Sequence, residues 1–389
     1  MERITLAGTD LVVSRVCLGT MQFSGSSDAS DATWGSCEQA QVDETVRAAL
    51  DAGISFFDCA EAYGKDRRAE RAFGAALRAC GAKRDEIVVT SKFGVHAPLW
   101  ETDSPTGAQT VYDGDAVARA LAASLEALQL EFLDLFQIHW PGNVGIVGGE
   151  QACRAAGTWD VVVSAVRALD DAKRGGKIRY YGVCNFGTED LAALAAAARE
   201  AGAGPPATNQ LPYNPLWRQI EHGIQSASDL PLLCYSPLQQ GLLSGKVFAA
   251  ADVADGRKRT RLYASDAAPL SRHGGPGAES LLFGEAGVLK NLAIIAADAG
   301  LSVAELSVAW LLARRGVACV LVGASSPAQA RRNARAPRAP AAALAKVDAA
   351  TDALKARLFA AYGGCVDQYA PESRVHGNGA PPRATCAVL

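Results

Sequence analysis

Short apolar runs rich in β-branched residues recur along the 389-residue chain, and each is followed by a longer segment whose apolar positions have helical spacing. The runs are continuous rather than alternating, which is typical of parallel strands whose outer face is covered by helices. The expected strands are VCLGTM (16–21), ISFFD (54–58), EIVVTSK (86–92), LDLFQIH (133–139), IRYYGVCN (178–185), ATNQLPY (207–213), PLLCYSP (231–237) and ACVLVGA (318–324).

The segments between these runs predict helices. QVDETVRAALDAG (41–53) ends on a glycine, and GDAVARALAASLEALQL (114–130) repeats apolar residues at helical spacing. TEDLAALAAAAREAG (188–202) is expected to begin with Thr188 as its N-cap. VAELSVAWLLARRG (303–316) is expected to end at its two arginines and glycine. A strand followed by a helix, eight times over, predicts a (β/α)8 TIM barrel of the α/β class.

A doubly wound open sheet is the alternative α/β architecture. It is disfavoured because no strand leads through a GxGxxG turn into a helix. GLLSGKV (241–247) superficially resembles a phosphate-binding P-loop, but its spacing is short and no Ser or Thr follows Lys246. We therefore expect a single barrel domain over residues 1–362, with a helical extension near 340–361, and a flexible C-terminal tail over 363–389.

Three connections are longer than the barrel needs, and each leaves the C-terminal end of a predicted strand. They are 93–113, 140–158 and 244–285. Barrel enzymes build their active sites on this face, and loops of this length are usually functional or disordered. Candidate walls of a substrate pocket are Trp34, Trp100 and Trp140, and ordinary loop packing explains each of them equally well.

Four polar side chains mark the C-terminal ends of three neighbouring predicted strands. Asp58 ends the second strand, and Tyr63 follows it by five residues. Lys92 ends the third strand and His139 ends the fourth. A lone lysine at a strand end is usually a solvated charge, and a lone histidine is more often structural than catalytic. Adjacent strand ends converge in a closed barrel, so these four complementary groups are expected to meet on one face.

Such a set suits the reduction of a carbonyl group. Hydride delivered to a carbonyl carbon leaves negative charge on the oxygen, which an acid must neutralise. A phenol with a pKa of about 10 is a weak acid at neutral pH, and we expect the ammonium of Lys92 to lower the pKa of Tyr63. Asp58 is expected to keep Lys92 charged, and His139 to hydrogen-bond and orient the carbonyl oxygen.

Composition excludes several classes of protein. Apolar residues make up 49% of the chain and charged residues 20%, so an extensive core is expected. A net charge of −3 with a pI near 6.0 gives no sign of a nucleic-acid partner. Ten cysteines lack the C-x-x-C spacing of zinc or redox sites, so no metal site is expected and a reducing, cytoplasmic location is favoured. Neither a targeting peptide nor a transmembrane segment is expected.

Three segments around the polar set resemble the catalytic segments of the aldo-keto reductases, a family of NADP(H)-dependent barrel oxidoreductases. They are FFDCAEAYG (56–64), VVTSKFG (88–94) and DLFQIHWP (134–141). The resemblance extends over most of the chain, because further segments are similar to the family's cofactor-binding segments and follow the same order. These are YYGVCNF (180–186), NQLPYN (209–214), YSPLQQGLLSGK (235–246) and LVGASSPAQARRN (321–333).

The resemblance implies a role for each polar group. Tyr63 is implied to be the proton donor, Asp58 and Lys92 to tune it, and His139 to orient the carbonyl group. The residues implied to bind NADP(H) are Asn185 and Gln210 at the nicotinamide carboxamide, Tyr235 on its ring, Ser236, Leu238, Gln240 and Lys246 along the pyrophosphate, and Gly323, Ser325, Gln329 and Asn333 at the adenosine end. A helix that opens after GASS is expected to direct backbone N–H groups toward phosphate.

Some positions depart from the family's pattern or allow two interpretations. Cys184 stands where Ser is usual and is a weaker hydrogen-bond donor, which is expected to reduce cofactor affinity. Gln239 replaces a common Gly, so a stiffer or shifted loop is expected. The other departures are Cys59 for a common Thr and Arg332 where an acid is common. The basic residues Arg257, Lys258, Arg259 and Arg261 suit either the 2′-phosphate of NADP(H) or a solvated loop.

The favoured function is NADPH-dependent reduction of an aldehyde or ketone to an alcohol, or the reverse oxidation, on a small-molecule substrate that the sequence does not name. The alternative is a cofactor-bound regulatory subunit, because the loop after the seventh strand and LVGASSPAQ (321–329) also resemble β-subunits of voltage-gated potassium channels. A structural barrel without cofactor is a third interpretation. The sequence leaves the physiological direction and the oligomeric state open.

The last four residues carry a separate signal. Cys386, Ala387, Val388 and Leu389 have the form of a prenylation box with a terminal Leu of the geranylgeranyl type. A chance match to so short a pattern is the alternative. One lipid chain would anchor the protein to a membrane only weakly.

Overall fold

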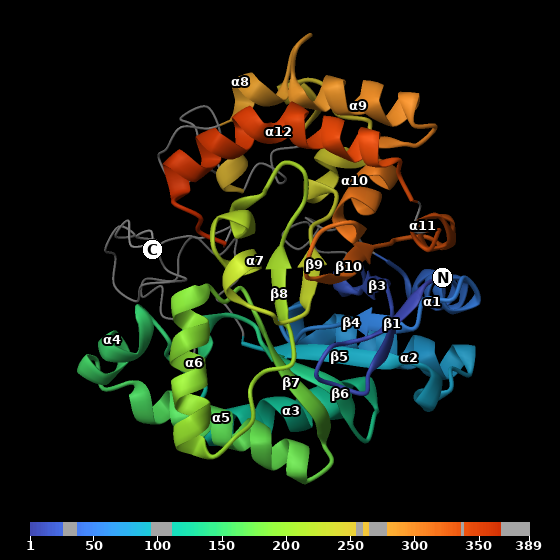
Figure 1. Ribbon diagram of the computed structural model, residues 1–389. Helices are drawn as coiled ribbons and strands as arrows, with labels where there is room; N and C mark the ends of the chain where they lie inside the picture. Colours follow the sequence, from blue (N-terminus) through green and yellow to red (C-terminus); the bar gives the residue numbers. More distant parts are fainter. Residues whose placement is uncertain (26–36, 95–110, 254–259, 264–277, 336–337, 367–389) are drawn as a thin grey trace.

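A closed barrel of eight parallel strands forms the centre of the protein in the computed structural model, which describes residues 1–25, 37–94, 111–253, 260–263, 278–335 and 338–366 (Figure 1). The strands are β3 (Val16–Gly19), β4 (Phe56–Asp58), β5 (Val88–Phe93), β6 (Leu133–Ile138), β7 (Ile178–Cys184), β8 (Asn209–Pro212), β9 (Leu232–Tyr235) and β10 (Val317–Gly323). Each pairs in parallel with its neighbours, and β10 closes the barrel against β3. The predicted (β/α)8 fold is confirmed, and the open-sheet alternative is wrong.

Helices surround the barrel and cover its strands (Figure 1). They are α1 (Gln39–Asp51), α2 (Arg68–Cys80), α3 (Gly114–Leu128), α4 (Gly149–Ala155), α5 (Trp159–Arg174), α6 (Thr188–Ala201), α7 (Ile224–Ala227), α8 (Glu279–Leu282), α9 (Val288–Asp298), α10 (Val303–Leu312), α11 (Pro327–Asn333) and α12 (Ala341–Tyr362). The regular alternation fails after β8, where only a 3-10 turn and the four-residue α7 precede β9.

Two predicted helix ends are wrong in detail. The cap of α6 is Gly187 rather than Thr188, because the carboxylate of Asp190 accepts the Gly187 N–H at 2.8 Å and the helix begins at Thr188 itself. At the other helix, α10 ends at Leu312, before the two arginines. The backbone carbonyl of Leu312 instead accepts a hydrogen bond from the guanidinium of Arg15 at 3.0 Å.

A hairpin at the N-terminus was not expected from the sequence. It consists of the short antiparallel strands β1 (Arg3–Thr5) and β2 (Val12–Ser14). Leu6, Leu11 and Val13 are fully buried and pack against Cys17 and Phe56 in the N-terminal part of the barrel strands. The hairpin therefore covers the barrel end opposite the predicted catalytic residues, and both strands are too short to show a clear alternation in the sequence.

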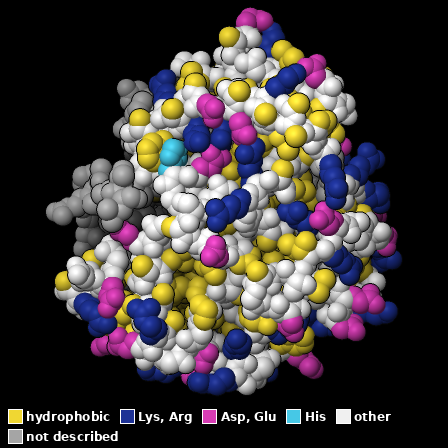
Figure 2. Space-filling model, viewed as in Figure 1, with side chains coloured by type: hydrophobic (Ala, Val, Ile, Leu, Met, Phe, Trp, Pro, Cys, Tyr) yellow, Lys and Arg dark blue, Asp and Glu magenta, His cyan; other side chains and the backbone are white. Residues whose placement is uncertain are grey.

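The last helix, α12, is held to the barrel by charged side chains. Arg218, only 5% exposed, binds Glu221 through Nε at 2.8 Å and the Thr351 hydroxyl through Nη1 at 2.9 Å. Both carboxylate oxygens of Asp348, in α12, accept from Arg314 Nη2 at 2.9 Å. Its Oδ1 also accepts the indole N–H of Trp310 at 3.0 Å. Figure 2 shows acidic and basic side chains gathered below α12 on this face. These contacts dock the C-terminal helix against α10 and the segment after β8.

By length and composition, no described helix could cross a membrane alone, and only α9 and α10 pass as a pair, bent by 85°.

Candidate active site

The four predicted catalytic side chains meet at the C-terminal end of the barrel. Asp58 is the last residue of β4, Lys92 lies near the end of β5, and His139 directly follows β6. Tyr63 lies in the loop between β4 and α2. Lys92 is fully buried, and its ammonium donates to Asp58 Oδ2 at 2.7 Å, to Tyr63 Oη at 2.8 Å and to the Cys59 carbonyl at 2.9 Å. Each of the three N–H donors of this lysine thus has a partner, and the Tyr63 phenol is one of these three partners.

Asp58 keeps this lysine charged. Burial on its own lowers the pKa of Lys92, but the nearby Asp58 carboxylate and the Tyr63 phenol raise it, and the net pKa lies above the ordinary lysine value. The second carboxylate oxygen, Oδ1, accepts from Gln210 Nε2 at 2.8 Å. Asp58 is therefore fixed on both sides, and Lys92 remains protonated at neutral pH.

Lys92 lowers the pKa of Tyr63, as expected, but a second effect is larger. Burial raises the pKa of Tyr63 above its usual value, and the ammonium of Lys92 offsets only part of this increase. Sequence reasoning counted the ammonium but not the loss of solvent around a phenol beside a buried ion pair. The phenol consequently holds its proton at neutral pH, and a hydrogen bond from Lys92 is in place to stabilise the phenolate once the proton leaves.

His139 and Trp140 lie next to the phenol. The His139 and Tyr63 rings form a T-shaped pair with centroids 6.2 Å apart, and the His139 ring stacks on the indole of Trp140 at 3.7 Å. The backbone N–H groups of both residues are bonded, His139 to the Phe93 carbonyl at 3.0 Å and Trp140 to Asn143 Oδ1 at 3.1 Å. The other candidate pocket walls, Trp34 and Trp100, lie outside the described residues.

The residues predicted to hold a carboxamide lie beside the catalytic group. Asn185 follows β7, donates through Nδ2 to the His139 carbonyl at 3.0 Å, and accepts the Tyr235 hydroxyl at 2.8 Å. Cys184 Sγ accepts from Asn185 at 3.3 Å and approaches Gln210 Oε1 to 3.7 Å. Two side-chain amides and an aromatic ring are thus connected by these contacts, and an amide side chain offers both donors and an acceptor.

Left-handed backbone concentrates in these predicted cofactor segments. Asn185, Ser236, Gln239 and Gln240 have φ values of 65°, 55°, 43° and 54°. Non-glycine residues in this region cost energy, and they cluster at functional sites. Gln239 is buried, and its Oε1 accepts from Asn214 Nδ2 at 2.6 Å, so the loop takes up the larger residue by turning its side chain inward.

The rest of the predicted pyrophosphate segment follows β9. It forms the 3-10 helix Gln239–Ser244 and continues to Lys246. Leu238 is half-buried and Lys246 is exposed. An exposed lysine at the end of this segment is free to adjust to an anion.

The predicted adenosine-end residues come together around the start of α11. Ser325 donates through its backbone N–H to Gln329 Oε1 at 2.8 Å, and Asn333 Nδ2 donates to the Gly323 carbonyl at 3.1 Å. A Cβ atom on Gly323 would lie 2.5 Å from the side-chain amide of Gln22, so a larger residue there would displace that side chain. Ser326 caps the helix, because its hydroxyl oxygen accepts the Gln329 N–H. One of the backbone N–H groups that were expected to face phosphate therefore already has a partner.

A sequence model of the aldo/keto reductase family matches residues 15–352, nearly the whole described barrel. The chain belongs to this family. The Aldo-keto reductase YhdN of Bacillus subtilis (strain 168) is 29% identical over 336 residues, which span 85% of this chain and 86% of the relative. Protein tas of Escherichia coli (strain K12) is 28% identical over 348 residues, 86% of this chain and 92% of the relative.

A third relative matches a shorter part. Methylglyoxal reductase DkgA of Yersinia pestis is 33% identical over 207 residues, 52% of this chain and 61% of the relative. Membership of the aldo/keto reductase family supports oxidoreduction of carbonyl compounds as the general activity, with a nicotinamide cofactor as is typical of the family.

Two residues of this family member were missed by sequence reasoning. Glu61, two positions before Tyr63, accepts from Arg67 at 2.8 Å, from the Tyr112 hydroxyl at 3.3 Å and from the Gly94 N–H at 3.2 Å. Burial raises the pKa of Glu61. Arg67 also donates to Glu70, so one ion-pair network ties the loop that carries Tyr63 to the end of β5 and to α2. The Glu in DCAEAYG was visible, but its partners are distant in the sequence.

Some predicted features fall on residues outside the described part of the chain. Residues 257–259 of the basic run lie outside the described residues, and Arg261 opens the short 3-10 helix Arg261–Tyr263. The prenylation box at Cys386 also lies outside them. The domain boundary at 362/363 stays a prediction.

Proposed function

We propose that this aldo/keto reductase reduces a small aldehyde or ketone to the alcohol with NADPH, or catalyses the reverse oxidation, with Tyr63 as the general acid. The contact of 2.8 Å between the buried Lys92 ammonium and the Tyr63 hydroxyl supports this proposal most directly. A lysine that served only stability would not need a titratable phenol as its third partner. The physiological direction depends on the substrate and stays open.

Four side chains of the protein have separate roles at the carbonyl oxygen of the substrate. Bound NADPH supplies the hydride that reduces the carbonyl carbon. Tyr63 gives its phenolic proton to the oxygen as negative charge develops there, and Lys92 stabilises the resulting phenolate through its existing hydrogen bond. Asp58 keeps Lys92 charged throughout. His139, beside the phenol, donates a hydrogen bond that orients the carbonyl group.

The cofactor residues are proposed from the same arrangement. Asn185 and Gln210 bind the carboxamide, and Tyr235 covers the nicotinamide ring while its hydroxyl holds Asn185 at 2.8 Å. The pyrophosphate is assigned to Ser236, Leu238, Gln240 and Lys246, and the adenosine end to Gly323, Ser325, Gln329 and Asn333. For the 2′-phosphate that distinguishes NADP(H) from NAD(H), we propose the basic run at 257–261 as the counter-charge.

A small carbonyl compound is the proposed substrate. The name of the Yersinia pestis relative suggests testing methylglyoxal, a small oxoaldehyde. Trp140, stacked on His139, offers a flat apolar surface next to the reacting position, which favours aromatic aldehydes as further candidates.

The test is a panel of aliphatic, aromatic and oxoaldehyde substrates with the purified protein and NADPH, followed through the loss of NADPH absorbance. We expect saturable NADPH oxidation with at least one class, and weaker affinity for NADH measured by quenching of Trp fluorescence. Quenching by NADPH without turnover of any substrate would contradict the enzyme and favour a cofactor-bound regulatory subunit. Absence of quenching would contradict cofactor binding altogether.

A further inference from the structure

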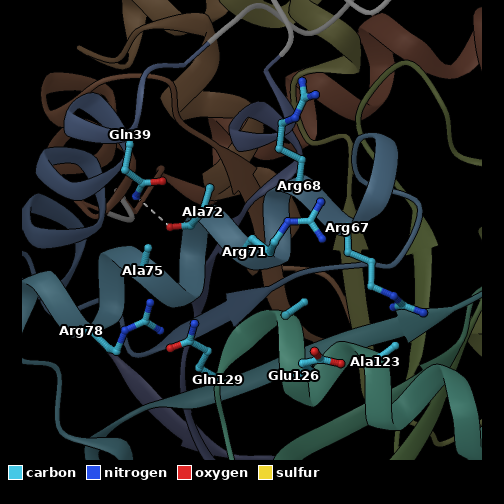
Figure 3. A pocket seen from close by; sticks show the side chains of 11 residues that line it. Gln39, Arg67, Arg68, Arg71, Ala72, Ala75, Arg78, Ala123, Glu126 and Gln129 are labelled. Carbon is cyan, nitrogen blue, oxygen red and sulfur yellow. Dashed lines mark hydrogen bonds between the residues drawn. The ribbon is translucent and has the colours of Figure 1, made fainter.

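A pocket of about 700 Å³ lies on the outer surface of the barrel, between α2 and α3 (Figure 3). Four arginines line it: Arg67 just before α2, Arg68 and Arg71 in the first turn of α2, and Arg78 in its last turn. None of the residues assigned above to catalysis or cofactor binding contributes to this lining. The pocket, called the α2–α3 pocket below, is therefore separate from the candidate active site.

Small side chains create the space of the α2–α3 pocket. Ala72 and Ala75 face it from α2, and Ala123 and Ala127 face it from α3, so a gap remains where larger residues would interlock. The two helices cannot close this gap by moving together. They already touch at Gly74, where an added Cβ atom would lie 2.3 Å from the Leu128 carbonyl oxygen.

The α1 end of the pocket is also fixed. Gln39 of α1 donates to the Ala72 carbonyl at 3.0 Å, which is the dashed line in Figure 3. The pocket is thus a permanent concavity, with three helices as its frame.

The charges around the α2–α3 pocket are not balanced. Arg67 is neutralised by Glu61 and Glu70. Among the described residues, Arg68 donates only to the backbone carbonyls of Gly25 at 2.8 Å and Ser24 at 3.5 Å, and Arg78 only to that of Gly74 at 3.0 Å. These bonds leave most of their N–H donors available, because a guanidinium has five.

Arg71 stands between these two arginines and is exposed. Within the described part of the chain it has neither a hydrogen bond nor an ion pair. Glu126, across the pocket on α3, contributes the single carboxylate of the lining and forms no ion pair with the described residues either. Within the part of the chain that the structure describes, three guanidinium groups without an ion-pair partner therefore share one concavity, and an anion placed among them lowers their mutual repulsion.

The shape and lining of the pocket favour a small, highly charged ligand. Its volume falls within the roughly 300–1,000 Å³ of small-molecule sites, while alanines provide little apolar contact. Guanidinium groups match the oxygens of phosphate in pairs of parallel hydrogen bonds. A long polyanion such as nucleic acid needs a basic stripe, whereas these arginines are confined to one concavity and the chain is acidic overall.

We propose that the α2–α3 pocket binds a small phosphorylated molecule with at least two negative phosphate groups, held by Arg68, Arg71 and Arg78. Arg67 stays engaged with Glu61 and Glu70 and forms the wall nearest to the Tyr63 loop. Binding there does not depend on the function proposed for the barrel face.

The experiment is a calorimetric titration of the full chain with tripolyphosphate, which carries the proposed chemistry without a base or sugar. We expect saturable binding to one site, weakened as ionic strength rises. The double substitution Arg71→Glu and Arg78→Glu should raise Kd by about tenfold or more, since it replaces charge-assisted hydrogen bonds by repulsion. Both residues are exposed, so folding should be kept, which circular dichroism checks; Arg71→Ala with Arg78→Ala is the milder second variant.

The matched control is the double substitution Arg167→Glu with Arg199→Glu, an equal change of charge at exposed positions of α5 and α6, which should bind tripolyphosphate like the unchanged protein. Equal binding by the pocket variant, or loss of binding in this control variant, would show that net charge rather than this pocket attracts the anion, and would overturn the proposal. Absence of saturable binding would overturn it as well. Tighter binding of a hexaglutamate peptide than of tripolyphosphate would replace it with an acidic protein partner.

Discussion

At the scale of single residues, the site depends on one buried lysine with three partners. Lys92 has no exposed surface, and its partners are a carboxylate, a phenol and a carbonyl. Removing one partner of a buried charge pair is strongly destabilising, whereas an exposed pair contributes little. The lysine is therefore expected to affect both stability and activity, and the two effects are separable.

Lys92→Met should lower carbonyl reduction by a factor of about 100 or more, because the phenolate that forms at Tyr63 loses its hydrogen-bonded cation. It should also lower the free energy of unfolding by roughly 3–5 kcal/mol, because Asp58 is left buried without its charge partner. Steady-state kinetics at a temperature where the variant is folded, with NADPH quenching as the folding check, measures the first effect. Denaturant titration measures the second.

Lys83→Met is the matched control. Lys83 is 71% exposed, and its pair with Glu86 at 2.8 Å is a surface contact, so stability should change by less than about 1 kcal/mol and activity not at all. A Lys92→Met variant that reduces aldehydes at the unchanged rate would contradict the role of the ammonium.

At the scale of elements, the sequence predicts those strands and helices that have a clear hydrophobic pattern. Most barrel strands were predictable because they are continuous apolar runs, although β8 contains Asn209 and Gln210. The four polar groups were predictable because they stand at or near strand ends. The hairpin of β1 and β2 was not, since two three-residue strands give no periodic signal. The missing full helix after β8 was not predictable either, because that segment is held by long-range contacts of Arg218 and Trp217 with the C-terminal region.

In the loop after β4, the sequence predicts which residues are polar but not how they are charged and paired in the folded protein. The segment DCAEAYG displays Asp58, Glu61 and Tyr63, and the first and last were assigned from their types. The importance of Glu61 depends on Arg67 and Gly94, and the direction of the Tyr63 pKa depends on how deeply the loop buries the ring. Burial and distant partners are properties of the folded chain, and local pattern does not supply them.

At the scale of the whole molecule, the charge network under α12 should make stability depend on pH. Burial on its own would raise the pKa of Glu221, but hydrogen bonds from Arg218, Lys355 and Tyr213 outweigh it and lower the pKa from 4.5 to about 2. A carboxyl group whose pKa is lower in the folded state stabilises it above the unfolded pKa, and this contribution disappears as the pH falls through the folded pKa.

Glu221→Gln should therefore lower the melting temperature at neutral pH. The difference from the unchanged protein should persist down to about pH 4.5 and shrink between there and about pH 2, where Glu221 becomes protonated in both states. Glu131→Gln, at an exposed glutamate on the surface before β6, is the control and should have no such pH-dependent effect. A constant difference over this whole range would contradict the lowered pKa.

The central claim is that Tyr63 delivers the proton in a reduction carried out by a nicotinamide-dependent barrel. The most direct measurement compares Tyr63→Phe with the unchanged protein in two assays, the rate of reduction of the best carbonyl substrate and the affinity for NADPH. The account predicts a rate lower by a factor of about 100 to 10,000, with the Kd for NADPH unchanged within about threefold, because the phenol contacts the substrate oxygen and Lys92 rather than the cofactor. A variant that binds NADPH and still reduces the substrate at nearly the original rate would contradict it.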